Sequence, residues 1–232
     1  MLAIIIVFLA GAKTEVWWWN WKISSWPGLF WLTWPFMKWW PFRTIFKIFG
    51  IKTRFLNELK CESIARIERA IHEYKYGYHR PVAGDFDKII IPDSDLPSGI
   101  KSVGTLALEY MVSRGISKEQ VVVIGKAVGT SEKCDAVRNY LDSIDYIKNY
   151  DIRMLYPVTT DYNAERVFQG LKKKVSCEVI AIYVNWKKIK HCLKEEMLYN
   201  LVTEGMKTWV DKHPQLQKIF SNFERRSRKK NK

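Results

Sequence analysis

The strongest constraint on the fold is a regular alternation between short apolar runs and longer amphipathic segments. Each run is rich in β-branched residues and bounded by glycine or polar residues, which is typical of a buried strand. The runs lie at 2–9, 88–91, 121–125, 153–159 and 177–184. Helical spacing of apolar residues is found at 56–77, 105–114, 131–144 and 163–173, and a longer amphipathic helical region is predicted from 186 to about 213.

Strands that alternate with helices at this spacing form a parallel sheet, and right-handed crossovers place helices on both of its faces. We therefore predict an α/β fold: a three-layer, Rossmann-like parallel sheet of about five strands, in a single domain over residues 1–220. The run at 2–9 could also be the core of a signal peptide. No Lys or Arg precedes it, and it is too short to span a bilayer, so a buried first strand is the better interpretation.

A tryptophan-rich stretch at 12–55 follows the first predicted strand as an insertion. Nine of the eleven tryptophans lie between residues 17 and 40, and prolines at 27, 35 and 41 exclude one long helix. Trp favours the membrane–water boundary, and interleaved Lys and Arg would meet anionic headgroups, so a membrane surface is predicted. A protein-docking patch and an aromatic subdomain are the alternatives. The residues assigned to the membrane interface are Trp17, Trp18, Trp19, Trp21, Trp31, Trp34, Trp39 and Trp40.

The net charge of +14 is concentrated in two peripheral segments. Residues 13–60 contribute +6 and the tail at 221–232, predicted to be disordered, contributes +5, which leaves 61–220 nearly balanced. A balanced body without an RNA-binding signature argues against a nucleic-acid partner. The four cysteines form no CxxC pair, so reduced thiols are expected. These features predict a cytoplasmic protein that is peripheral at the membrane.

Polar residues occupy three predicted strand-to-helix corners, where ligands of parallel sheets bind. At 125–132, Gly129 permits an unusual backbone, and Thr130 with the following helix amides could hold an anion; an ordinary helix cap is the alternative. At 92–98, Asp93 and Asp95 could bind a cation or act as a base, but two acidic residues in a loop usually belong to a solvated turn.

The third corner, at 158–166, combines Thr159, Thr160, Asp161 and Asn163 with Arg166 one turn into the helix. Such an arginine could bind phosphate or carboxylate in a bidentate manner, or it could face solvent on a capped helix. The chain has no HxH, HExxH, GxSxG or GxGxxG motif, so the sequence supports no metal site, hydrolase elbow or dinucleotide fingerprint. It identifies no cofactor and no oligomeric state.

The ordered series of motifs resembles the SanA/YdcF/ElyC-like family, an envelope-associated group with a Rossmann-like domain of unknown function. MLAIIIVFLAGA resembles the family's opening strand and glycine turn, and RIERAIHEYKYG, which begins at Arg66, resembles its arginine-led helix. GTSEKCDAVRNYL resembles the NTxEN motif and keeps Thr130 and Glu132. VTTDYNAERV resembles a Thr-rich strand end that leads to a His and an Arg.

The chain is a divergent member by this comparison. Gly129 and Lys133 replace the asparagine pair of NTxEN, and Asn163 replaces the histidine of the later motif, so proton transfer at that position is lost. Pro92-Asp93 replaces a Gly-Gly after the second strand.

The resemblance implies a role in envelope or polysaccharide metabolism, with an anionic, phosphorylated or nucleotide-like ligand or a lipid phosphate as partner. The implied ligand-binding residues are Arg66, Thr130, Glu132, Thr159, Asn163 and Arg166. Glu132 and Asp161 are the candidate catalytic residues. The alternative is a non-catalytic, membrane-docked binding protein that has lost the family's chemistry.

Overall fold

The first strand, β1 (Leu2–Val7), lies at the centre of the main sheet and is buried on both faces. The computed structural model describes residues 2–10, 12–18, 21–22, 51–77, 86–94, 101–127, 129–143, 152–189, 213 and 215. A strand covered on both faces needs apolar residues at every position, and LAIIIV meets that requirement. The interpretation of this run as a buried first strand is confirmed.

The main sheet is parallel throughout the described strands. Its order is β6-β5-β1-β7-β8, with β9 also paired to β7. The partners of β1 are β5 (Phe86–Ser94) on one side and β7 (Ile152–Thr160) on the other, and β6 (Val121–Ala127) lies beyond β5. The predicted α/β class with a Rossmann-like parallel sheet is confirmed.

The last predicted strand, at 177–184, is two short strands instead of one. They are β8 (Glu178–Val179) and β9 (Ile182–Val184), and both pair with β7. The carbonyl of Leu155 accepts a hydrogen bond from the Ile180 amide. The backbone N–H and C=O groups of odd-numbered residues in β7 therefore point toward β8 and β9. Pro157 is one of them, and because proline has no N–H it cannot donate to the neighbouring strand there.

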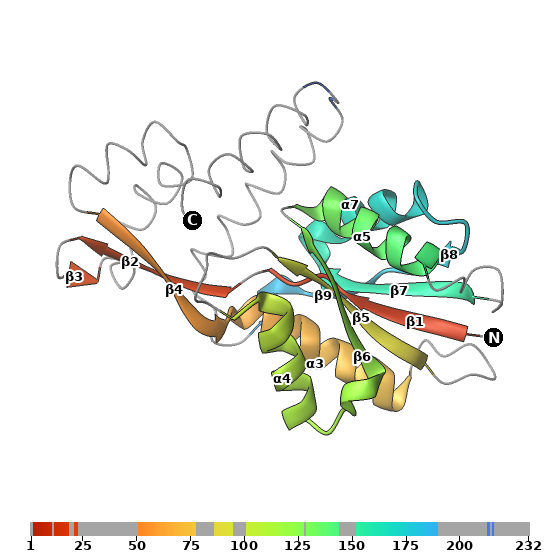
Figure 1. Cartoon of the computed structure of the whole chain (residues 1–232), viewed down its shortest axis with the longest axis horizontal. Helices are drawn as coiled ribbons and strands as arrows, with labels where there is room; N and C mark the ends of the chain where they lie inside the picture. The colour runs from red at the N-terminus through yellow and green to blue at the C-terminus, as the bar shows by residue number, and fades with distance from the viewer. Residues whose placement is uncertain are drawn as a thin grey trace.

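The helices among the described residues cover both faces of the sheet (Figure 1). The helices α3 (Cys61–Tyr76) and α4 (Val103–Ser113) pack on one face, and α5 (Thr130–Ser143) and α7 (Asp161–Lys172) pack on the other. Strand alternation supplies each face with its own core: Ile5 and Val7 of β1 pack toward α3, whereas Ile4 and Ile6 pack toward α5 and α7.

The predicted helix at 56–77 begins later than its apolar spacing indicates. Residues up to Leu59 belong to the strand β4 (Ile51–Leu59), and α3 starts at Cys61. Pairing with β2 (Ala12–Trp18) holds this segment extended, which overrides its local helical pattern. The helix ends as predicted at Gly77, whose φ of 50° is left-handed.

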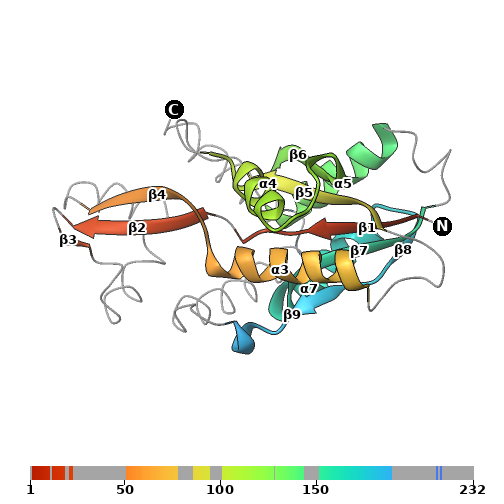
Figure 2. The same ribbon diagram turned by 90° about the horizontal axis from the view of Figure 1, so that it is seen from below.

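The described residues at the two ends of the insertion form an antiparallel sheet in the order β3-β2-β4, where β3 is Trp21–Lys22. Figures 1 and 2 show this ribbon extending away from the α/β body. Trp17 and Trp18 lie near its far end, where Trp18 pairs with Trp21 in the register. The other five tryptophans that the sequence assigns to a membrane interface lie outside the described residues. So do the tail at 221–232 and most of the predicted helical region that begins with η3 (Trp186–Lys188).

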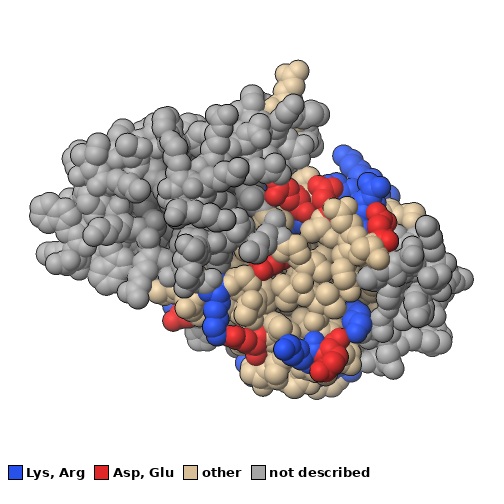
Figure 3. All heavy atoms as spheres, in the orientation of Figure 1, with Lys and Arg blue, Asp and Glu red and all other residues tan. Residues whose placement is uncertain are grey.

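Acidic and basic side chains are interspersed over the described surface of the body (Figure 3). This distribution agrees with the nearly balanced charge of residues 61–220. Within the described ranges, no helix has the length and hydropathy needed to cross a bilayer. The same ranges contain no cluster of three or more His, Cys, Asp or Glu arranged to hold a metal ion.

Asp93 is part of the fold and is not a residue of a solvated turn. It is 5% exposed, and its Oδ1 accepts hydrogen bonds of 2.7 Å from the backbone amides of Ser94 and Gly104. The carboxylate thus accepts a hydrogen bond from an amide in the first turn of α4. Its negative charge also interacts favourably with the positive end of the α4 helix dipole. The proposed partner of Asp93, Asp95, lies outside the described residues.

The expectation of reduced cysteines is wrong at one position. Cys61, the first residue of α3, is disulfide-bonded, whereas Cys134 and Cys177 are free thiols. Cys134 is buried between α5 and α7, where it packs as a small apolar side chain. The sequence carries no motif that distinguishes these cysteines, because a disulfide depends on a spatial approach that spacing does not reveal.

Candidate functional site

The strand order creates a switch point between β1 and β7. The chain leaves β1 toward β5 and β6 on one side of it, then crosses the sheet and continues through β7 on the other side. In open sheets of this kind, ligands bind beyond the carboxyl ends of the two strands at the switch. Here those ends are residues 8–10 after β1 and Thr159–Asp161 at the end of β7.

One polar cluster fills the α3 side of this switch point. Arg66 is 3% exposed and donates to the backbone carbonyl of Phe8, to the Glu62 carboxylate and, at 2.7 Å, to Oγ1 of Thr160. Oε1 of Glu62 also accepts from the hydroxyls of Thr160, at 3.0 Å, and of Tyr162. The cluster joins α3 to the ends of both strands and to the first turn of α7.

Electrostatics hold Glu62 of this cluster ionised and Tyr162 neutral. Burial would raise the pKa of Glu62, but the Arg66 charge and the hydrogen bonds from Tyr162 and Thr160 together lower it. Burial, with the Glu62 carboxylate next to it, raises the pKa of Tyr162 well above its usual value despite the opposing Arg66 charge. Tyr162 therefore acts as a hydrogen-bond donor and is not suited to proton abstraction near neutral pH.

The lowered pKa of Glu62 predicts an acid-sensitive fold. The ionised Glu62 carboxylate stabilises the folded state. This stabilisation is fully present above the ordinary carboxyl pKa of 4.5 and is lost as the pH falls through the lower pKa that Glu62 has in the folded protein. We expect the free energy of unfolding to fall more steeply below pH 4.5 in the wild type than in the double variant Glu62→Gln/Arg66→Met. Urea unfolding at a series of pH values measures this difference, and parallel curves would contradict it.

A second polar cluster lies on the opposite face, toward α5 and α7. The Asn163 side-chain amide donates to Oγ1 of Thr159 at 3.1 Å, and both residues are buried. Lys133, in the first turns of α5, is 7% exposed and donates from Nζ to the carbonyl of Leu9 at 3.1 Å. Side chains from β7, α7 and α5 are thus collected around the carboxyl ends of β1 and β7.

Within the part of the chain that the structure describes, two buried polar atoms at the switch point have no hydrogen-bond partner. They are Oδ1 of Asn163, an acceptor, and Nε of Arg66, a donor. Buried polar atoms in native proteins are nearly always paired, so each of these two atoms needs a partner, such as a water molecule or a ligand, on its own face of the sheet.

The structure divides the sequence-predicted binding residues between the two clusters. Successive residues of a strand point to opposite faces, so Thr160 meets Arg66 on one face and Thr159 meets Asn163 on the other. Arg66 and Thr159 therefore do not share a contact, although both lie at the carboxyl end of the sheet. The guanidinium of Arg66 makes three contacts with the protein itself, which gives it a positioning role in the fold.

The remaining predicted residues lie at helix starts beside these clusters. Thr130 begins α5, and Glu132 lies in its first turn; both are half-buried. Asp161 begins α7, where its Oδ1 accepts from the Tyr162 amide at 2.9 Å, and Arg166 is half-buried in the next turn. The unusual backbone expected at Gly129 occurs instead at Gly125, whose φ is 61°.

Sequence reasoning missed Glu62 and Tyr162 and treated Lys133 only as a departure from a motif. A signal for Glu62 exists, because it precedes Arg66 by four residues, which is the spacing of a helical ion pair. Tyr162 lies 100 residues from Glu62, and nothing local in the sequence indicates that contact. Comparison with known proteins returns no matching family model, no matching curated protein and no matching solved structure.

Proposed function

We propose that the chain binds a small anionic ligand, phosphorylated or nucleotide-like, at the carboxyl ends of β1 and β7. The observation that carries the proposal is the unpaired, buried Oδ1 of Asn163 at the switch point. An acceptor of this kind suits a ligand hydroxyl or amine, such as those of a sugar or a nucleotide. Strand ends at a switch point are also where such ligands bind in open α/β sheets.

The surrounding groups favour a negative charge on that ligand. The N-termini of α5 and α7 both point to this end of the sheet, and the backbone amides at a helix N-terminus attract anions. Lys133 adds a buried cationic side chain, whereas the charge of Arg66 is balanced by the Glu62 carboxylate. Arg166 lies on the second turn of α7, and we propose that its guanidinium also contacts the anion.

A thermal-shift screen of the whole chain tests the proposal. The probes are inorganic phosphate, nucleotides, sugar nucleotides and polyprenyl phosphates, and a ligand that binds only the folded state raises Tm by mass action. We expect a probe at 100 times its Kd to stabilise the wild type by about 2.7 kcal/mol. No shift with any probe would contradict the proposal.

Asn163→Leu should abolish that shift, and Gln169→Leu should keep it. Both substitutions replace an amide on α7 by leucine, but Gln169 is exposed and bonds only to the neighbouring turn, at Glu165. Without ligand, Asn163→Leu should retain its fold, because it removes the unpaired Oδ1 together with the amide. Equal ligand-induced shifts in the two variants would place the ligand elsewhere.

Binding without proton transfer is the form of the proposal that the side chains support best. Asn163 cannot titrate, and Tyr162 is held neutral. Asp161 and Glu132 remain the candidate catalytic residues, both at the starts of helices beside the site. A role in envelope or polysaccharide metabolism, as the resemblance to the SanA/YdcF/ElyC-like family implies, is part of the proposal.

A second candidate function, docking to a membrane surface, is favoured by the antiparallel ribbon. The ribbon extends away from the body and carries Trp17, Trp18 and Trp21 near its far end (Figure 2). Lys22 and Lys52 pair with Trp17 in the register, so basic residues accompany the aromatic ones. Trp beside Lys suits the boundary between acyl chains and anionic headgroups.

Co-sedimentation with vesicles tests this docking. We expect the wild type to bind vesicles containing phosphatidylserine, and the triple variant Trp17→Ser/Trp18→Ser/Trp21→Ser to lose most of that binding. Tyr76→Ser removes an aromatic that is 69% exposed at the end of α3 and should change nothing. Equal sedimentation of the triple variant and the wild type would exclude the ribbon as the contact.

The compartment of the proposed membrane-peripheral protein follows from its cysteine chemistry. Stable disulfides are rare in the cytosol of most organisms and persist in oxidising compartments. The disulfide at Cys61 therefore favours an oxidising compartment over the cytoplasmic location expected from the sequence.

A further inference from the structure

The outer edge of β6 is a part of the fold that the strand-end site does not use. Among the described strands, β6 pairs only with β5, and it lies at one end of the order of the main sheet. In such an edge strand, alternate backbone N–H and C=O groups point away from the sheet and are available to pair with another chain. Figures 1 and 2 place β6 at one side of the α/β body, between α4 and α5.

The first part of β6 carries none of the features that discourage pairing with another chain. Edge strands are usually protected by a charged side chain, a proline or a bulge. In the sequence of β6, VVVIGKA, the charged residue is Lys126, and the pairing with β5 becomes irregular after Ile124, where Gly125 has a φ of 61°. The segment Val121–Ile124 precedes both features, and its four residues are all apolar and β-branched.

Apolar residues of α4 flank this edge on one side. Gly104 packs against β6, because a Cβ built on it would lie 2.4 Å from Cγ1 of Val123. The same side of the helix continues at four-residue spacing with Leu108 and Val112. Leu108 is half-buried and Val112 is 44% exposed, so this side of α4 leaves apolar surface uncovered beside β6.

Helix α5 flanks the other side of the same edge. The Cβ of Ala136 lies 3.0 Å from the position of a Cβ built on Gly125, and the half-buried Tyr140 follows one turn later on the helix. Figure 3 shows the face on which β6 lies, where charged side chains are sparse over the centre and gather around the margin. Protein–protein interfaces have this arrangement, with few charges at the core and a polar rim.

The size of this face fits an interface between two identical chains. Helix α5 has 14 residues and is about 21 Å long, and a sheet with a helix on each side is about 30 Å thick. The face therefore offers about 600 Å², and specific interfaces bury about 600–1,000 Å² on each partner. A second copy related by a two-fold axis presents the same edge in the antiparallel direction, so β6 is complementary to itself.

We propose that two copies of the chain associate through β6, whose strands pair antiparallel across a two-fold axis and join the two main sheets into one. In this dimer α4 meets α4 of the other copy and α5 meets α5, with Val112 and Tyr140 in the contact. The surface is separate from the strand-end site, and the association does not depend on the anionic ligand.

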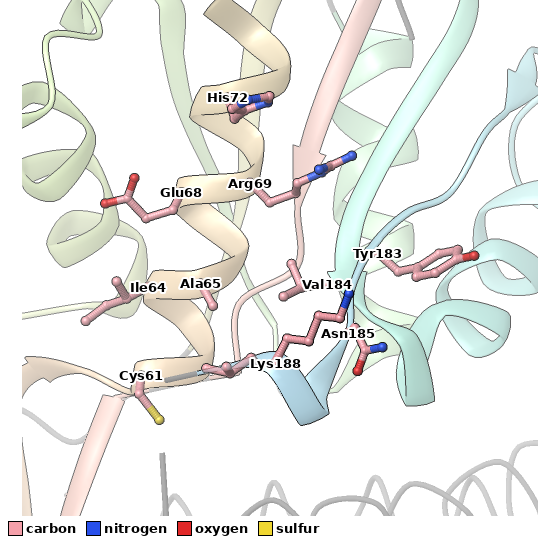
Figure 4. Close-up of a pocket in the computed structure, with 11 residues that line it drawn as sticks. Cys61, Ile64, Ala65, Glu68, Arg69, His72, Tyr183, Val184, Asn185 and Lys188 are labelled. Atoms are coloured by element: carbon pink, nitrogen blue, oxygen red, sulfur yellow. The ribbon is translucent and has the colours of Figure 1, made fainter. Parts of the chain in front are cut away.

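Sedimentation equilibrium of the whole chain tests the association. We expect a mass twice that of one chain for the wild type at micromolar concentration, and the mass of one chain for Val112→Lys, which places a charge in the contact. Tyr183→Lys is the matched control and should remain a dimer. Tyr183 is 60% exposed on β9, on the opposite side of β1 from β6, beside a groove that is also lined by the charged Arg69 and Lys188 (Figure 4).

Hydrogen exchange locates the contact on β6. In the dimer, the amides of Val121–Ile124 that point away from β5 donate to the other copy. At a protein concentration of about ten times the dimer Kd, we expect these amides to exchange about tenfold more slowly than in Val112→Lys, and dilution of the wild type should remove the difference. A wild type that stays a single chain would overturn the proposal. So would a dimer in which Val112→Lys changes neither the mass nor the exchange of β6.

Discussion

Arg66→Met should destabilise the protein by about 3–5 kcal/mol, the largest single-residue effect we expect. Arg66 and Glu62 are 4% and 3% exposed as side chains and form an ion pair one helical turn apart. Removing the arginine leaves a buried carboxylate whose charge the protein no longer compensates. It also removes the donors that reach the carbonyl of Phe8 and the hydroxyl of Thr160. Urea unfolding monitored by circular dichroism measures the loss.

Arg138→Met is the matched control, because Arg138 and Asp142 form an ion pair with the same spacing on α5. Both of its side chains are more than half exposed, so its loss should cost no more than about 1 kcal/mol. The double variant Glu62→Gln/Arg66→Met removes both buried charges and should be more stable than Arg66→Met alone. An equal loss of unfolding free energy in Arg66→Met and Arg138→Met would show that burial does not increase the contribution of the Arg66–Glu62 pair to stability.

Gly104→Ala should destabilise the protein by about 1–3 kcal/mol, even though alanine is the better helix former. A Cβ at position 104 would lie 2.4 Å from Cγ1 of Val123 and 2.9 Å from Cγ of Asp93. Gly104 lies in the first turn of α4 and packs directly against β5 and β6, so neither neighbour can move without disturbing the core. The steric cost therefore exceeds the gain of roughly 1 kcal/mol in helix propensity.

The control is Gly129→Ala, at the start of α5. No atom lies within 4 Å of a Cβ built there, so the substitution should change stability by less than about 0.5 kcal/mol. Differential scanning calorimetry of the two variants separates the steric effect from the general effect of replacing glycine by alanine. A Gly104→Ala protein as stable as the wild type would mean that α4 sits farther from β6 than the structure places it.

The sequence predicted the layers of the fold well because each core strand and helix carries its own periodic signal. β1, β5 and β6 are apolar throughout their centres, and this pattern is sufficient to place them inside a parallel sheet. Boundaries set by contacts distant in sequence could not be predicted. Leu56 to Leu59 has helical spacing, yet pairing with β2 holds it in a strand.

The sequence predicted where the polar strand-to-helix corners lie, but it predicted their arrangement only in part. The corners at Thr130 and Thr159 do lie at the carboxyl end of the sheet, as the topology of parallel strands requires. The placement of Thr159 and Thr160 on opposite faces follows from strand alternation and could have been derived. The contact of Tyr162 with Glu62 could not, because it depends on how α3 and α7 approach the same strand ends.

The most direct test of anion binding at the switch point is a titration of the ¹⁵N-labelled chain with inorganic phosphate and with ADP, followed by amide chemical shifts. We predict saturable shifts confined to residues 8–10, 129–133 and 159–163, the segments that meet at the carboxyl ends of β1 and β7. Asn163→Leu should remove the ADP-dependent shifts in all three segments. Shifts spread over the exposed lysines and arginines, or no shift at these segments, would contradict the proposed site.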